Sequence, residues 1–469
     1  MSYDDAFITY RYAYNLATGQ GFVYNPGEWF MGTTAPFYGL LLGALGWLFG
    51  AETIPTISGV ISGLSLVLAG VALYVYGRLH EQPLCGLLAG LFFVCNPLLP
   101  PTFGGEMLFQ VALIAWIFVL YHMERTCTAA FLLALAVLTR MDSVIALGVI
   151  GLYDIITKRR VPWREGIIIG LTLLPFALLS WWFYGAFFPV TFGAKIAQRQ
   201  SGLWPPYLSR MRDWISAFTI QGSSRVLPHL PAAPHAIRFI YFVLMGIPAL
   251  VFFRFWLLPL AWVMLYVLGY VILDVPFYHW YVVPIIFGLM IVAACGVAGL
   301  VELLIIVARQ LRRTPQTALW ARRGLSILVV AALLPGLIAF CRYTAMLAAS
   351  PNIGRQLYEK TGHWLAENTP SGSNVGYFEI GFIGYYGHRT MVDPLGLLDP
   401  EIVPHVAQTD LTWAYEQRRP DYIIQNQLIF TDYIGKVVEE AWFKREYREI
   451  AQINEPGYPP LIIYQRISP

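Results

Sequence analysis

Residues 2–36 read SYDDAFITYRYAYNLATGQGFVYNPGEWFMGTTAP, and this polar stretch stands before a chain that is otherwise strongly apolar. It holds two adjacent carboxylates, Asp4 and Asp5, and further polar residues such as Arg11 and Glu28. A polar segment of this length beside a bundle of apolar helices indicates a function at the boundary between water and membrane. We therefore expect residues 2–36 to contribute to a reaction centre.

The composition of the whole chain predicts a polytopic α-helical membrane protein. The 469 residues are 57% hydrophobic and 13% charged, with a mean hydropathy of +0.57, whereas soluble proteins carry roughly 25% charged residues. A net charge of +3 gives no strong positive field, so no nucleic-acid partner is expected. The aromatic content of 15% is typical of aromatic belts at two membrane surfaces.

About ten segments of the chain are candidates for spanning helices, which need about 20 apolar residues each. Two of them, 127–140 and 143–157, are short and could form one broken unit. The candidates are 54–77, 84–100, 107–123, 127–140, 143–157, 166–185, 237–254, 256–273, 280–307 and 324–343.

Basic residues set the expected orientation, because short basic loops favour the cytoplasm. The strongest basic clusters lie at 158–164 and 309–323. Placing both inside requires the N-terminal segment to lie outside. A further span at 35–50 would invert every later loop, so we interpret this segment as an interfacial or re-entrant helix. Its glycines, in GLLLGALGWLFG, are interpreted as helix-packing positions.

This orientation places most of the acidic and histidine residues on the outer side of the membrane. The long loop 186–236 also lies outside, although it carries Lys195 and several arginines. Long loops can be translocated regardless of charge, and their basic residues could also bind phosphate or anionic headgroups.

Residues 344–469 are less apolar and predict a small extracytoplasmic α/β domain. The chain would then divide into a transmembrane domain, 1–343, which includes an outer catalytic loop at 1–53, and this domain, 344–469. Within the latter, short strands are expected in 372–387, 419–426 and 459–467, and amphipathic helices at 352–368 and 432–449.

The five cysteines lie in or beside apolar stretches and form no CxxC pattern. We interpret them as small buried residues, without a disulfide framework or a metal cluster. They are Cys85, Cys95, Cys127, Cys295 and Cys341.

The acidic pair supports a catalytic interpretation and a structural one. One carboxylate could act as general base on an acceptor hydroxyl while the other positions it. Alternatively, Asp4 or Asp5 could cap a helix over 6–17. The sequence GFVYNPGE, at 21–28, predicts a strand and a tight turn that bring Glu28 back toward the pair.

Further candidates lie at the expected outer ends of apolar helices. Glu106 would be a second acid near the site or a first-turn helix charge. Arg140 and Asp142 could line the site or pair with one another at the membrane edge.

Lys195 could bind a phosphate as a point charge or simply extend to the membrane surface. His279 and Tyr281, at the start of an apolar helix, could assist it or belong to an aromatic belt.

Several motifs resemble those of GT-C superfamily membrane glycosyltransferases, in particular the protein-mannosyltransferase-like group and the bacterial terminal arabinofuranosyltransferases. The stretch 4–36 is similar to the first outer loop of these enzymes. Further similar motifs occur in the same order and cover almost the whole chain. They are GEMLFQVAL at 105–113, LTRMDSVIAL at 138–147, WFYGAFFPVTFGAK at 182–195, FYHWYVVP at 277–284 and VGYFEIGFIGYYGHRTMVDPLGLLDPE at 375–401.

The resemblance implies a bacterial inner-membrane enzyme that transfers a sugar, on the outer face of the membrane, from a polyprenyl-phosphate donor to a glycan, lipid or protein acceptor of the cell envelope. It implies an acidic base in the first outer loop, and Asp4 is slightly preferred over Asp5 because the first of the pair is the usual candidate. The matching positions that would shape the sugar site are Arg11, Tyr12, Asn15, Glu28 and Thr33.

An inverting single displacement is the simplest mechanism, with Lys195 meeting the charge of the leaving phosphate. No cofactor is expected, and a divalent metal is possible without being predicted. Similar enzymes carry a spanning helix before the acidic pair, so we expect that the reading frame starts further upstream.

Two other classes of protein remain open at this stage. In a transporter or lipid flippase with an outer soluble domain, Arg140 and Asp142 would line a path. In a membrane scaffold, the C-terminal domain would bind a partner. Against a transporter, the sequence shows no internal repeat and its acidic residues gather on one side. A scaffold leaves the polar residues in 2–36 unexplained.

Overall fold

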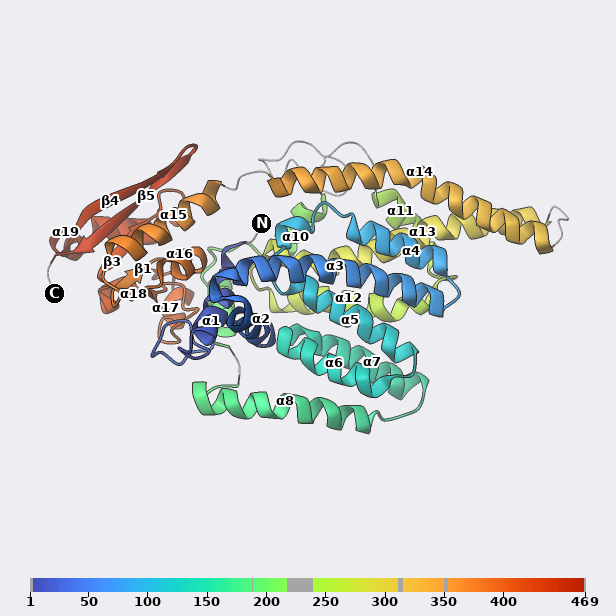
Figure 1. Ribbon diagram of the computed structural model, residues 1–469, viewed down its shortest axis with the longest axis horizontal. Helices are drawn as coiled ribbons and strands as arrows, with labels where there is room; N and C mark the ends of the chain where they lie inside the picture. The colour runs from blue at the N-terminus through green and yellow to red at the C-terminus, as the bar shows by residue number, and fades with distance from the viewer. Residues whose placement is uncertain (1–2, 188, 217–238, 311–314, 350–352, 468–469) are drawn as a thin grey trace.

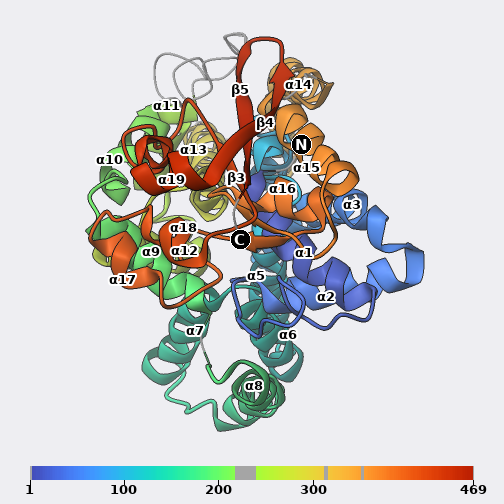
Figure 2. The same ribbon diagram turned by 90° about the vertical axis from the view of Figure 1, so that its left-hand side faces the viewer.

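The computed structural model describes residues 3–187, 189–216, 239–310, 315–349 and 353–467. It consists of an elongated bundle of apolar helices with a small sheet-containing domain at one end (Figure 1). The first two helices lie at that same end, beside the small domain (Figures 1 and 2).

Most helices of the first 349 residues follow the apolar segments of the sequence, and each of the ten expected spans overlaps one helix. They are α1 Asp4–Ala17, α2 Pro36–Phe49, α3 Ile54–Leu79, α4 Pro83–Val94, α5 Met107–His122, α6 Thr126–Thr139, α7 Val144–Thr157, α8 Trp163–Tyr184, α9 Val190–Gln200, α10 Tyr207–Ser216, α11 Phe239–Ala249, α12 Leu257–Leu273, α13 Val283–Gln310 and α14 Pro315–Ala349. Three short 3-10 turns lie between consecutive helices: η2 Pro100–Thr102, η3 Met141–Ser143 and η6 His279–Val282. Because η3 separates α6 from α7, segments 127–140 and 143–157 are two helices.

Four helical stretches in the described part of the chain are long and apolar enough to cross a membrane. They are Ala51–Leu79, Trp163–Tyr184, Arg254–Leu273 and His279–Val307, and shorter apolar helices accompany them. Only 11% of the apolar window in Trp163–Tyr184 is buried inside the protein. An apolar helix that packs so little against protein has lipid as its natural surroundings.

Glycines allow neighbouring helices to approach closely, as the sequence predicts for segment 35–50. A Cβ added to Gly43 of α2 would lie 2.7 Å from Leu16 Cδ2 of α1. In the bundle, a Cβ on Gly86 of α4 would lie 2.7 Å from the Leu73 carbonyl oxygen of α3. The packing interpretation of these small residues is therefore confirmed.

The C-terminal domain contains a mixed five-stranded sheet of order β2-β1-β3-β5-β4. Strand β1 pairs in parallel with β2 and β3, while β5 pairs antiparallel with β3 and β4. The strands are β1 Asn374–Gly376, β2 Thr390–Val392, β3 Tyr422–Gln425, β4 Tyr447–Glu455 and β5 Tyr458–Arg466. The helices are α15 Ile353–Asn368, α16 Ile380–Gly387, α17 Val403–Ala407, α18 Trp413–Arg418 and α19 Ala441–Glu446.

Three local expectations were wrong, because distant contacts override local patterns. The helix expected over 432–449 ends with α19, because pairing with β5 turns residues from Tyr447 onward into a strand. The second half of the expected strand segment 372–387 is the helix α16, while its first half contains the strand β1. Residues 21–28 form no strand, since the Asn15 side-chain amide, rather than a neighbouring strand, donates to the Val23 and Tyr24 carbonyls at 2.8 Å each.

The N-terminal segment shares a hydrophobic core with the C-terminal domain, separate from the core of the bundle. Phe7 of α1 is fully buried and packs on Phe382 of α16, with ring centroids 4.2 Å apart. Burying such a side chain stabilises the structure by roughly 1.5–3 kcal/mol. Residues 3–53 therefore sit between the bundle and the sheet.

The division of the chain at 343/344 stays a prediction, and α14 continues across it to Ala349. The expected loop 186–236 is described up to Ser216, except for residue 188. Its remaining part, including Arg225, lies outside the described residues.

Candidate active site

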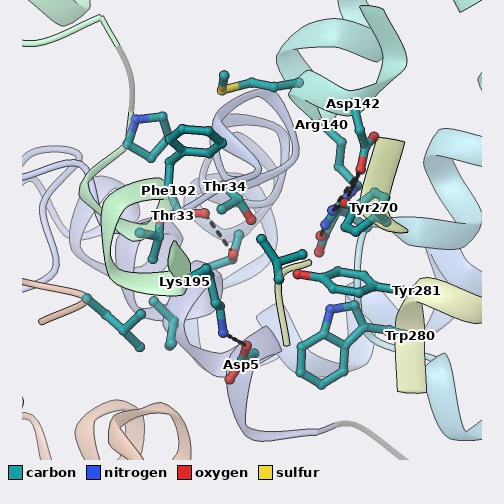
Figure 3. A pocket seen from close by; sticks show the side chains of 18 of the residues that line it. Asp5, Thr33, Thr34, Arg140, Asp142, Phe192, Lys195, Tyr270, Trp280 and Tyr281 are labelled. Atoms are coloured by element: carbon teal, nitrogen blue, oxygen red, sulfur yellow. Dashed lines mark hydrogen bonds and ion pairs between the residues drawn. The ribbon is translucent and has the colours of Figure 1, made fainter. Parts of the chain in front are cut away.

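A cavity of about 390 Å³ lies where the end of the bundle meets the N-terminal segment. Helix α1 contributes Asp5, α9 contributes Lys195, and the turns η3 and η6 contribute Asp142 and Tyr281 (Figure 3). Charged side chains thus converge from elements far apart in the chain. The sequence-predicted residues that line the cavity are Asp5, Thr33, Glu106, Arg140, Asp142, Lys195 and Tyr281.

One side of the cavity is formed by an ion pair between Asp5 and Lys195. The Lys195 Nζ lies 3.5 Å from Asp5 Oδ2 and 3.8 Å from the ring centroid of Tyr278. The Asp5 side chain is 34% exposed and that of Lys195 is 14% exposed, so the carboxylate remains reachable from the cavity. Figure 3 shows the two side chains pointing toward one another.

The pKa of Lys195 reflects these partners. Burial alone would lower the pKa of the ammonium group, but Tyr278, Asp5 and Tyr281 together outweigh burial and raise it above its ordinary value. These neighbours therefore favour the protonated form of Lys195.

The opposite wall holds a buried network around Arg140. Its guanidinium contacts Glu106 Oε1 at 2.6 Å and Asp142 Oδ2 at 2.9 Å. The Tyr270 hydroxyl donates to the same Asp142 oxygen at 2.7 Å. With two carboxylates around one guanidinium, this wall presents fixed hydrogen-bonding groups and an excess of negative charge (Figure 3).

Asp4 differs from Asp5, because its carboxylate does not line the cavity. It accepts hydrogen bonds from the backbone amides of Gly381 and Phe382, at 2.9 and 2.8 Å, and so caps the first turn of α16. Burial raises the pKa of Asp4 to about 7, although these two hydrogen bonds oppose the shift. Asp4 thus joins α1 to the C-terminal domain, and it caps α16 rather than its own helix.

Thr33 and Tyr12, two further predicted residues, order the loop between α1 and α2, which reaches the cavity. Thr33 lines it, and its hydroxyl shares a 2.9 Å hydrogen bond with that of Thr9. The Tyr12 hydroxyl donates to the Phe30 carbonyl and accepts from the Gly32 amide, at 2.6 Å each. Like Asn15, Tyr12 supports the loop without lining the cavity.

Arg11, Glu28 and His279 also lie away from the cavity surface. Arg11 is buried and its Nη1 donates to His388 Nδ1 at 2.7 Å. Glu28 is exposed and accepts from the Asn25 amide at 2.8 Å. His279 lies 3.3 Å from the Pro101 carbonyl oxygen.

Sequence reasoning missed several lining residues, among them Tyr3, Thr34, Phe192, Tyr270 and Trp280. Tyr270 carries a hydroxyl in a mainly apolar helix, and polar groups in such a helix are a functional signal. Trp280 stacks on Tyr3 with ring centroids 4.3 Å apart, a contact that no local pattern reveals.

Among the described residues, no group of three or more His, Cys, Asp or Glu side chains is arranged to hold a metal ion. Asp5, Glu106 and Asp142 each have a basic side chain as partner.

Comparisons with known proteins give one family match and several similar folds. Residues 351–465 match the model of a domain of unknown function, DUF8728. No curated protein matches the chain. The oligosaccharyltransferase AglB from Archaeoglobus fulgidus, in complex with an inhibitory peptide and a dolichol-phosphate, is similar at 13% identity and a TM-score of 0.55. The match covers 92% of this chain and 66% of AglB, so the chain spans about two thirds of that protein.

ArnT from Cupriavidus metallidurans, bound to undecaprenyl phosphate, is similar over nearly its whole length. The identity is 13% and the TM-score 0.56, with 99% of this chain and 94% of ArnT covered. At this identity the similarity establishes the fold alone. The chain is therefore a polytopic helical membrane protein that shares the fold of ArnT and AglB, as expected from its sequence resemblance to GT-C superfamily membrane glycosyltransferases.

Proposed function

We propose that this protein transfers a sugar from a polyprenyl-phosphate donor to a cell-envelope acceptor on the outer face of the inner membrane. The observation that carries the proposal is the Asp5–Lys195 pair, 3.5 Å apart in a cavity at the end of an apolar bundle. A carboxylate beside a cation suits a reaction in which a hydroxyl loses a proton while an anionic group departs.

In the proposed reaction, Asp5 takes the proton of the acceptor hydroxyl. The hydroxyl oxygen forms a bond to the anomeric carbon as the bond from that carbon to the phosphate oxygen breaks. The polyprenyl phosphate leaves with the electron pair, and Lys195 stabilises its charge. A single displacement of this kind inverts the anomeric configuration.

The choice of Asp5 over Asp4 rests on where the two carboxylates point. Asp4 uses both oxygens to cap α16, whereas Asp5 faces the cavity. A general base must reach the proton that it removes, and only Asp5 of the pair meets this condition.

The size and lining of the cavity suit a single sugar on a lipid phosphate. A volume of about 390 Å³ lies near the lower end of roughly 300–1,000 Å³ for small-molecule sites, which favours a monosaccharide donor. Val144, Ile145 and Leu273 give one part of the lining an apolar character. Val144 and Leu273 are each 52% exposed, so the polyprenyl chain could leave between α7 and α12 toward lipid.

The test uses the purified full chain in proteoliposomes with undecaprenyl-phosphate monosaccharides carrying radiolabelled pentoses or hexoses. Label transferred to an envelope extract is the readout. Asp5→Asn should lower the rate about 10²–10⁴-fold, the range for loss of a general base. The control Asp410→Asn changes an acid of the outer domain whose side chain is 46% exposed, and it should keep the wild-type rate.

Two results would contradict this proposal. If Asp5→Asn transferred sugar at the control rate, Asp5 would not be the general base. Absence of transfer by the wild-type chain with every donor, together with movement of the intact lipid across the bilayer, would indicate a flippase.

A further inference from the structure

Four of the five cysteines form two close pairs between helices. The sulfurs of Cys85 and Cys295 lie 3.5 Å apart, and so do those of Cys95 and Cys341. One cysteine of each pair lies in or directly after α4: Cys85 near its start and Cys95 as the residue that follows its last turn. Helix α4 therefore contacts α13 through one thiol pair and α14 through the other.

The two pairs differ in their surroundings. Cys85 and Cys295 are both buried, whereas Cys341 is exposed and Cys95 is partly exposed. The sequence interpretation of all cysteines as buried was thus wrong for Cys341, and also for the exposed Cys127.

The two pairs also lie at different levels along the bundle. Helix α4 runs toward the end that carries the sheet domain, and α14 runs in the same direction and leads into that domain (Figure 1). Cys95 and Cys341 therefore lie nearer the sheet domain than Cys85 does. In the orientation proposed above, this places them near the outer ends of their spans, toward the oxidising compartment.

We propose that Cys95 and Cys341 form a disulfide bond that joins α4 to α14. The two thiols lose two electrons and two protons in total, and a disulfide donor of the outer compartment is reduced to two thiols in exchange. A disulfide needs a sulfur–sulfur distance of about 2.05 Å, so side-chain rotations must bring the sulfurs about 1.5 Å closer. The inference rests on the proposed orientation of the chain and not on the sugar-transfer chemistry.

The bond would restrain the segment that follows Cys95, which contacts η6 and α1. Cys95 is followed by η2, where the Pro101 carbonyl oxygen lies 3.3 Å from His279 Nε2. Two residues after η2, the Gly104 carbonyl accepts hydrogen bonds from Tyr10 and Ser58, at 2.5 and 2.6 Å. A covalent link from this segment to α14 would hold the helix leading into the sheet domain against residues that support α1.

The experiment measures the thiols of the full chain, purified in detergent after oxidation by glutathione disulfide. The protein is unfolded in SDS before alkylation, so that burial protects no thiol. Three of the five cysteines should be alkylated before reduction and all five after it, and peptide mass spectrometry should find Cys95 joined to Cys341. Cys95→Ser and Cys341→Ser should each abolish the link, whereas the matched control Cys85→Ser should leave it in place.

Three outcomes would overturn the inference. These are alkylation of all five cysteines before reduction, a link between Cys85 and Cys295 instead, or a link from Cys341 to a second copy of the chain. The Asp5→Asn variant should form the same disulfide bond as the wild type. Failure of the disulfide proposal can therefore be distinguished from failure of the proposed transferase activity.

Discussion

Asp4 and Asp5 are adjacent in the chain, yet their carboxylates have different partners. Asp4 accepts two backbone hydrogen bonds from α16, while Asp5 meets the ammonium group of Lys195 in the cavity. Successive residues of a helix point about 100° apart, so one turn can serve the fold and the cavity together. The acidic pair therefore need not act as two equivalent acids.

Replacing Lys195 should weaken binding of the carrier phosphate. A hydrogen bond to a charged group contributes about 1.5–3 kcal/mol, so Lys195→Met should raise the Kd for undecaprenyl phosphate about 10- to 150-fold. Titration in detergent micelles, followed by tryptophan fluorescence, measures this. Lys360→Met removes a lysine of the sheet domain that is 56% exposed and should leave the Kd unchanged. An equal Kd in the two variants would assign Lys195 to another role.

Glu106→Gln should destabilise the protein, because it removes one partner of the buried Arg140 guanidinium. Both side chains are less than 10% exposed, and breaking such a pair costs about 3–5 kcal/mol. Asp142 still contacts Arg140, so the lower end of that range is expected. The matched variant Glu165→Gln breaks a pair whose arginine is 44% exposed and should cost about 0–1 kcal/mol. Thermal unfolding in detergent compares them, and equal losses would count against the buried network.

At the scale of elements, the contact between α1 and α16 holds the N-terminal segment on the C-terminal domain. A Cβ added to Gly381 would lie 1.9 Å from the Asp4 carbonyl oxygen, so the two helices touch through backbone there. The residue pattern of 380–387 alone does not reveal this, because the partner helix lies at the opposite end of the sequence.

Gly381→Ala should therefore separate α1 from α16. Overpacking of this kind costs typically 1–3 kcal/mol, and the displaced α1 should also misplace Asp5 and lower transfer. Gly372→Ala is the matched control, because nothing lies within 4 Å of a Cβ at that position. Limited proteolysis of the junction and transfer rates measure both effects, and a stable, fully active Gly381→Ala protein would contradict the contact.

Hydropathy and charge predicted the helices of the bundle because burial in lipid depends on composition over about 20 residues. They could not predict α16 or β4, whose conformations depend on α1 and β5 as partners. For the cavity, motif positions identified Asp5, Lys195 and Arg140 as candidates. Choosing Asp5 over Asp4 required the amides of Gly381 and Phe382, which no sequence spacing places beside the acidic pair.

At the scale of the whole molecule, buried acids gather where the N-terminal segment meets the sheet domain. Burial raises the pKa of Asp4 and of Asp393 to about 7 each, and that of Glu379 to about 8. In the unfolded chain these groups ionise near their ordinary values of about 4. Between about pH 4 and 7 the unfolded state therefore holds fewer protons than the folded state, so these groups lower stability as the pH rises.

Asp4→Asn should reduce this dependence, because an amide does not ionise. Wild-type protein should show a melting temperature that falls from pH 4 to pH 7 more steeply than that of the variant. The control Asp410→Asn, at an exposed position, should retain the wild-type slope. Identical slopes for wild type and Asp4→Asn would show that folding does not change the pKa of the Asp4 carboxylate.

The shared core of the N-terminal segment and the C-terminal domain has a consequence for synthesis of the chain. Asp4 and its partner Gly381 are 377 residues apart, with the whole bundle between them. At roughly 5–20 residues per second, α1 waits on the order of 20–75 seconds before α16 exists. Until then Phe7 lacks its contact with Phe382, and Asp4 lacks the two backbone amides that it accepts hydrogen bonds from. A nascent or truncated chain therefore has nothing of the sheet domain against which α1 can be held.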